Sequence, residues 1–261
     1  MAIDFHAESN ADTYAKRSAA AEWHSAMVGL LNPKGAQVAD IGCGGGVYTR
    51  AWRELGAGHV EGVDFSEVMV ATAGKKAADL TGVHFRKGSA EETGLEAAHF
   101  DVVFERALIH HLAALVPAFR EAFRILRPGG LLIVQHRTMD DVLQPATTEH
   151  LRGYFFKALP RLLDKEMSRR PDGATVQAAL AAAGFEETAS QTLWETRKIY
   201  PDRQALADDL RNRTGRSILH ELDDAELEQL ISEVMLHAPG SGEIRERDRW
   251  TVFTARKPVE A

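Results

Sequence analysis

The residues of this chain that are best suited to bind a ligand lie in one glycine-rich segment. It reads Val-Ala-Asp-Ile-Gly-Cys-Gly-Gly-Gly over residues 38–46, with Asp40 two positions before the first glycine. Glycine is needed where the backbone takes positive φ angles or where a ligand approaches the main chain closely. A second acid, Asp64, follows at close to the ~20-residue spacing at which a carboxylate accepts hydrogen bonds from a ribose. Together these residues predict a site for an adenosine-like ligand.

The charge of the glycine-rich turn distinguishes between two classes of adenosine ligand. The dinucleotide pattern needs Gly or Ala five residues after its first glycine, and counting from Gly42 that position is Val47. The carboxylate of Asp40 would repel a pyrophosphate, whereas it would attract a cation. A sulfonium compound with a free ammonium group fits that charge. The sequence therefore favours S-adenosylmethionine over NAD.

Three further side chains are candidates for acid–base chemistry on a methyl acceptor. Glu105 and His110 follow a predicted strand over 100–104, and His136 ends a predicted strand over 131–135. Ligands bind at this carboxyl edge in open α/β sheets. His110 and His111 are adjacent, so they point in different directions and do not form a chelating pair. A packing role for His110, a polar strand end at His136 and a structural role for Glu105 remain open, and we expect no metal site.

The elements that must position these residues are indicated by short apolar runs that alternate with helical patterns. Such alternation is typical of a parallel sheet covered on both faces. Arg127-Pro128-Gly129-Gly130 predicts a stop between a helix and the fifth strand. The predicted strands are Gln37–Ile41, His59–Asp64, Val83–Lys87, Phe100–Phe104, Leu131–Gln135, Phe185–Leu193 and 248–256. The predicted helices are 10–31, 46–55, 66–78, 112–126, 173–184, 202–213 and 223–237, with a helical excursion over 140–169.

Composition restricts the class of protein and its partners. The formal net charge is −7 and no basic stripe is present, so we expect no nucleic-acid partner. The longest stretches without charged residues, 107–119 and 173–185, are shorter than the ~20 residues of a membrane-spanning helix, and we expect no membrane partner. The N-terminus lacks a signal-peptide pattern, and a single cysteine, Cys43, excludes an intrachain disulfide, so a cytoplasmic location is expected.

The order and spacing of these motifs resemble the class I S-adenosylmethionine-dependent methyltransferases over roughly residues 35–137. Residues 38–46 resemble their first motif, and Asp64-Phe65-Ser66 resembles the acidic end of their second strand. Gly88-Ser89-Ala90-Glu91 resembles the loop after strand 3, with Ser89 where an Asp is frequent. Residues 100–104 and 127–130 resemble their strand-4 and pre-strand-5 signatures.

The resemblance implies an α/β, Rossmann-like, doubly wound and mostly parallel sheet of about seven strands, the last antiparallel, with helical insertions. It implies one domain over 1–261, with a cofactor-binding core at 35–137, an N-terminal helical lid at 1–34, and insertions at 138–170 and 202–240 near the acceptor site. The cofactor is S-adenosylmethionine, the product S-adenosylhomocysteine, and the reaction an in-line methyl transfer. Carried over by position, the cofactor-binding residues are Tyr14, Asp40, Gly42, Cys43, Gly44, Asp64, Phe65, Met69, Ser89, Ala90, Glu91 and Arg106.

The acceptor is expected to be a small molecule, because the chain has no separate recognition domain; the oligomeric state is left open. Two rival functions are a module that binds S-adenosylmethionine or S-adenosylhomocysteine without turnover and a dinucleotide-dependent oxidoreductase, which Asp40 and Val47 disfavour.

Three other groups of residues have two interpretations each. Residues 154–156 fit a core or an apolar lid, Arg211, Arg213 and Arg216 fit a solvated face or an anion clamp, and residues 243–249 fit an exposed hairpin or strand edge.

Overall fold

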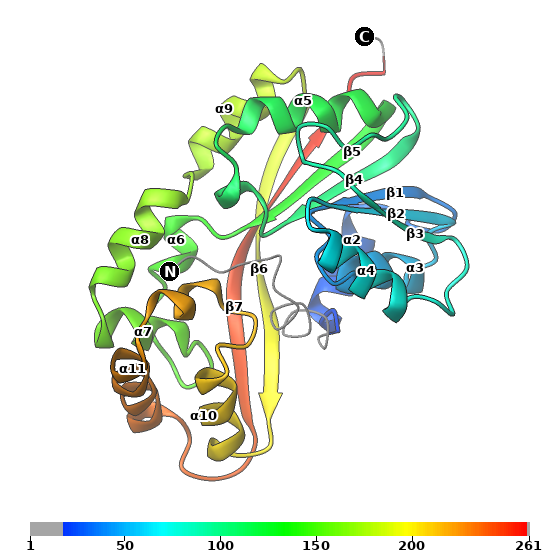
Figure 1. Ribbon diagram of the computed structural model, residues 1–261. Coiled ribbons are helices and arrows are strands. Elements are labelled where there is room, and N and C mark those ends of the chain that lie inside the picture. The colour runs from blue at the N-terminus through cyan, green and yellow to red at the C-terminus, as the bar shows by residue number, and fades with distance from the viewer. Residues whose placement is uncertain (1–17, 260–261) are drawn as a thin grey trace. The chain divides into compact units, whose positions relative to one another are not determined.

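The computed structural model describes residues 18–259 (Figure 1). These residues belong to two compact units. The larger unit comprises residues 18–136, Pro171–Leu193 and 251–259, and the smaller unit comprises Arg137–Arg170 and Trp194–Trp250. The helical insertions expected at 138–170 and 202–240 lie in the smaller unit. The assignment of the whole chain to one domain stays a prediction.

A mixed, mostly parallel sheet of seven strands confirms the expected fold class. The strand order is β3-β2-β1-β4-β5-β7-β6. Neighbours among the first five strands run parallel, whereas β7 pairs with β5 in the antiparallel sense. The strands are β1 (Gln37–Ile41), β2 (His59–Asp64), β3 (Val83–Lys87), β4 (Phe100–Arg106), β5 (Leu126–His136), β6 (Glu186–Tyr200) and β7 (Ile244–Arg256).

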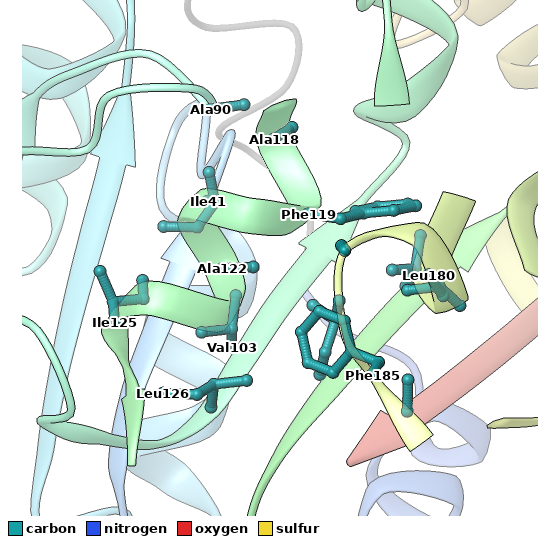
Figure 2. Close-up of a cluster of buried hydrophobic side chains, with 14 of the residues drawn as sticks. Ile41, Ala90, Val103, Ala118, Phe119, Ala122, Ile125, Leu126, Leu180 and Phe185 are labelled. Atoms are coloured by element: carbon teal, nitrogen blue, oxygen red, sulfur yellow. The ribbon is translucent and has the colours of Figure 1, made fainter. Parts of the chain in front are cut away.

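Helices cover both faces of the sheet in the larger unit, because side chains alternate between the faces along each strand. Val38 and Phe104 pack on one face with Trp23 and Trp52, which come from α2 (Ala21–Leu30) and α3 (Val47–Glu54). On the opposite face, Ile41, Val103 and Val134 pack with residues of α5 (Leu115–Ile125) and α9 (Gly173–Ala182). Figure 2 shows Phe119, Leu180 and Phe185 in this second cluster. Helix α4 (Glu67–Lys76) follows β2.

The smaller unit has its own apolar core. Its helices are α6 (Met139–Val142), α7 (Arg152–Ala158), α8 (Arg161–Arg169), α10 (Arg203–Arg211) and α11 (Asp224–His237). Phe155 and Phe156 are buried in this core with Leu206 and Leu230, so the aromatic residues of the 154–156 segment are core residues here. The helical excursion expected over 140–169 consists of three helices, α6, α7 and α8.

Acidic side chains of β7 point into the smaller unit, which corrects the expectation of an exposed edge over residues 243–249. Glu246 and Asp248 are buried, because alternate residues of a strand face the same side. Glu246 Oε2 accepts hydrogen bonds from Arg197 at 3.0 Å, from Arg216 at 2.6 Å and from Tyr200 at 2.8 Å. Asp209 also accepts from Arg216, at 2.8 Å. Arg216 is therefore a buried anchor, which means here that it pairs with two carboxylates of the protein itself. It is neither a solvated residue nor a clamp for a bound anion.

The boundary expected at Arg127-Pro128-Gly129-Gly130 is wrong, because β5 already begins at Leu126. Phe100 of β4 lies opposite Leu126, and Val102 lies opposite Leu131. The additional β5 residues are accommodated by this register shift, and Gly129 has φ +78°. Strand β6 extends to Tyr200, and β7 begins at Ile244, both beyond the expected bounds.

Replacing the buried anchor should destabilise the smaller unit. Burial raises the pKa of Glu246, but the charges of Arg216 and Arg197 outweigh this effect and lower the pKa to about 2. Arg216→Ala would leave two buried carboxylates with fewer partners, and we expect a loss of about 3–5 kcal/mol in the free energy of unfolding. Urea unfolding followed by circular dichroism measures this loss.

The matched control is Arg211→Ala, which removes an exposed arginine paired with Glu228. We expect a change of less than about 1 kcal/mol in that variant. Equal stability of the two variants would contradict the structural role of Arg216.

Candidate functional site

The glycine-rich turn connects β1 to α3, and its glycines differ in what surrounds them. Gly42, Gly44 and Gly46 all have positive φ angles, of +72°, +51° and +73°. A Cβ atom at Gly42 would lie 2.9 Å from a methyl of Leu108, and one at Gly46 would lie 2.9 Å from the ring of Phe85. At Gly44, the same atom would meet no other atom within 4 Å. Two glycines therefore permit close packing, whereas Gly44 borders open space.

The carboxylate of Asp64 holds this turn in place. Its Oδ2 accepts a hydrogen bond from the backbone N–H of Gly44 at 2.9 Å, and its Oδ1 accepts one from Ser66 at 3.0 Å. Ser66 in turn caps α4 by accepting from the backbone of Met69. This anchoring of the turn by Asp64 is missing from the sequence analysis, which assigned the carboxylate to ribose binding only. Asp64 and the turn are thus brought together as the spacing predicted.

Asp40 is buried directly behind the turn. Thr49 donates a hydrogen bond to its Oδ2 at 2.6 Å. Burial, with the nearby charge of Asp64, raises the pKa of Asp40 to about 7, although the hydrogen bond from Thr49 and the charge of Arg106 lower it. The carboxyl group can therefore change its charge near neutral pH.

Arg106, at the end of β4, lies close enough to Asp40 to lower the pKa of its carboxyl group, and it stacks on an aromatic ring. Its guanidinium carbon is 4.3 Å from the centre of the Tyr48 ring. Tyr48 was missed by the sequence analysis; its place in the first turn of the helix after the glycines is the signal that could have identified it. Negative charges (Asp40 and Asp64) and a positive charge (Arg106) therefore lie beside the same turn, together with the ring of Tyr48.

Glu105 points to the opposite face of the sheet from Asp40. It lies in register with Ile41 of β1 and Val134 of β5, which belong to the cluster under α5 and α9. Burial, with the charge of Glu91, raises the pKa of Glu105 to about 8. No described residue forms a hydrogen bond with its Oε2. A proton on Glu105 at neutral pH follows from this environment.

The structure brings two of the predicted acid–base residues together. His110 lies in a short 3₁₀ helix, Ile109–His111, and its ring centre is 5.5 Å from that of His136 at the end of β5. His136 is fully buried. Imidazole rings can accept and donate protons, so this pair at the carboxyl edge of the sheet suits acid–base chemistry.

The other predicted residues occupy varied surroundings. Phe65 is exposed beside Asp64, and Met69 is buried in α4. Ser89 Oγ accepts a hydrogen bond from the backbone of Glu92 at 3.0 Å, which shapes the loop that contains Ala90 and the exposed Glu91. Tyr14 lies outside the described residues.

Burial raises the pKa of the Cys43 thiol well above its ordinary value, which disfavours a nucleophilic thiolate. Over residues 18–259, no group of three or more His, Cys, Asp or Glu side chains is arranged to hold a metal ion. Within the same range, no helix has the length and apolar character needed to cross a membrane.

The chain is similar in sequence to known methyltransferases. A methyltransferase domain model matches residues 39–134. The chain is 32% identical over 157 residues to a ubiquinone biosynthesis O-methyltransferase from Azorhizobium caulinodans, covering 59% of this chain and 60% of that protein. It is 28% identical over 172 residues to a ubiquinone/menaquinone biosynthesis C-methyltransferase from Vibrio campbellii, covering 59% and 66%. The matches thus cover less than two thirds of either relative.

A solved structure shares the fold. It is that of a candidate methyltransferase from an antibiotic biosynthesis pathway of Anabaena variabilis, with a TM-score of 0.70 and 20% identity, covering 91% of this chain and 98% of that one. The cofactor of such enzymes is S-adenosylmethionine, whose charge suits the acid-lined turn. Residues 39–134 therefore match the methyltransferase domain family, and the chain is similar in sequence and fold to known methyltransferases.

Proposed function

We propose that this chain transfers the methyl group of S-adenosylmethionine to a small-molecule acceptor. The observation that carries the proposal is the turn at Gly44, which borders open space while two carboxyl groups, Asp40 and Asp64, lie beside it. A diphosphate would meet negative charge there, whereas a sulfonium amino acid would meet a complementary environment. This supports S-adenosylmethionine and argues against a dinucleotide.

The residues around the turn fit distinct parts of this cofactor. Asp40 suits the ammonium group, Arg106 suits the carboxylate, and the backbone at Gly42, Cys43 and Gly44 permits close approach. Asp64 retains acceptor capacity for ribose hydroxyls, since a carboxylate offers about four lone-pair sites. Phe65, Met69, Ser89, Ala90 and Glu91 would frame the adenine, and Tyr14 would belong to the lid.

The bound cofactor supplies an electrophilic methyl group, so the chain has to orient the acceptor and exclude water. An acceptor hydroxyl, phenol or ammonium also has to lose a proton. The neighbouring rings of His110 and His136 support a role as base for this pair. Glu105 is a weaker candidate for the base, because a carboxyl group with a pKa of about 8 already holds its proton at pH 7.

The acceptor class follows from charge and from the relatives together. The net charge of −7 offers no basic footprint for nucleic acid, which supports a small molecule. The relatives are named for O- and C-methylation in quinone biosynthesis, so they leave the acceptor atom open. The single cysteine, which excludes an intrachain disulfide, supports a cytoplasmic location.

The open space at Gly44 yields a test of the cofactor site. Gly44→Val should abolish S-adenosylhomocysteine binding in titration calorimetry, because the branched side chain would occupy that space and the positive φ angle disfavours it. Gly74→Ala is the matched control, since its Cβ also meets nothing within 4 Å but lies in the regular helix α4. If Gly44→Val bound S-adenosylhomocysteine as tightly as the wild type, the cofactor would not bind at this turn.

The pKa of Asp40 predicts how cofactor affinity depends on pH. Only the ionised carboxylate attracts the ammonium group, so the dissociation constant of S-adenosylmethionine should fall by up to about tenfold per unit as pH rises toward 7, and then level off. Asp40→Asn should bind more weakly, with no such dependence between pH 5.5 and 7. The same slope in both proteins would exclude Asp40 as the titrating group.

The histidine pair predicts a loss of turnover with the cofactor site intact. Labelled methyl transfer to a metabolite extract, followed by mass spectrometry, would first identify the acceptor. His136→Ala should then lower kcat by about 10²–10⁴-fold if the ring acts as a base, and leave cofactor affinity within about twofold. His99→Ala, a change at a partly exposed histidine, serves as control.

Two results would contradict this account. If His136→Ala lost cofactor affinity in proportion to its loss of kcat, the ring of His136 would have no specific role in proton transfer. Cofactor binding without any labelled product in the extract would favour the binding module over the enzyme.

A further inference from the structure

The smaller unit contains a buried cluster in which arginines outnumber carboxylates. Asp248 accepts a hydrogen bond from Arg152 at 3.0 Å and lies 3.1 Å from Arg137. Glu166 pairs with both Arg169 and Arg170. Arg170 joins the two groups, because it donates a hydrogen bond to the backbone carbonyl of Arg137 at 3.2 Å. Four cations thus meet two anions in these six side chains.

A second buried cluster of this unit has fewer arginines for each carboxylate. There, the buried Arg197 and Arg216 meet Asp209 and Glu246, and the half-exposed Lys198 also pairs with Asp209. Two buried carboxylates thus pair with two buried arginines in that group. In the cluster around Arg137, two carboxylates, Asp248 and Glu166, have to pair with four arginines.

Several donors of the Arg137 cluster have nothing to bind. Nε of Arg137 and Nε of Arg169 are buried, and no described residue forms a hydrogen bond with either. Burial, with the like charge of Arg152, lowers the pKa of Arg137 well below its ordinary value, although Asp248 and Glu166 raise it. Leaving buried charged donors unpaired is costly, and together with the excess of arginines over carboxylates these donors point to a bound anion.

The surroundings of Arg137 suit an organic anion. Its guanidinium lies over the ring of Trp250, 4.5 Å from the ring centre, which fixes the plane of the donor fork. His150 packs edge-on against Trp194, at 5.4 Å between ring centres, and the pKa of His150 is lowered by burial and by Arg152 and Arg137. The side chains of Arg137 and Arg169 are 13% and 15% exposed, so part of each is open to solvent.

We propose that Arg137, Arg152, Arg169 and Arg170 form a binding site in the smaller unit for the carboxylate or phosphate group of an organic anion. Arginine forks match both groups, because each presents paired oxygens to parallel N–H donors. The proposal concerns residues of the smaller unit alone and does not depend on methyl transfer.

Binding of inorganic phosphate to the full chain tests the site without any methyl transfer. Titration calorimetry in a chloride-free buffer should detect phosphate binding to the wild type, and Arg137→Gln should weaken it about 10- to 100-fold. Arg211→Gln, which removes an exposed arginine of the same unit, should bind phosphate as the wild type does. S-adenosylhomocysteine binding by each variant checks that the chain remains folded.

Either of two results would overturn the site. The first is no phosphate binding to the wild type, and the second is equal binding by the wild type and Arg137→Gln. Weaker phosphate binding by Arg137→Gln with unchanged binding by Arg211→Gln supports the site.

Discussion

The structure of the cofactor site depends on one carboxylate that accepts two backbone hydrogen bonds. Asp64 binds the N–H of Gly44 and the N–H of Ser66, so it joins the turn after β1 to the start of α4. Hydrogen bonds to an ionised acceptor are stronger than neutral ones, and they hold the positive-φ backbone of Gly44 in place before any ligand arrives. The open space beside Gly44 is therefore a preformed feature of the chain, and its acidic surroundings select a cation.

The pairing of β1 with β4 separates the charges of the site into two groups. Asp40 lies opposite Phe104, and Ile41 lies opposite Glu105, so the two acids face opposite sides of the sheet. Asp40 is on the side of α2 and α3, with Tyr48 and Arg106 near it, whereas Glu105 is on the side of α5 and α9. A change of one residue in this register would exchange the two faces. The distribution of acids thus follows from strand geometry.

The sequence predicted those parts of the fold that local patterns determine. The bounds of β1, β2 and β3 match because each is a short run between turn residues, and the glycine turn with Asp64 follows from spacing. The start of β5 could not be predicted, since Pro-Gly-Gly ordinarily ends an element and only pairing with β4 retains it in the sheet. The buried acids of β7 were misread because their partners, Arg152, Arg197 and Arg216, are distant in sequence. Tyr48 beside Arg106 was missed for the same reason.

The central claim is that an acid-lined turn selects a sulfonium nucleoside and rejects a diphosphate. Parallel calorimetric titrations of the purified chain with S-adenosylhomocysteine, S-adenosylmethionine and NADH test it most directly. The account predicts saturable one-to-one binding of both adenosyl amino acids and no detectable heat from NADH. Saturable binding of NADH, with no response to either adenosyl compound, would contradict it.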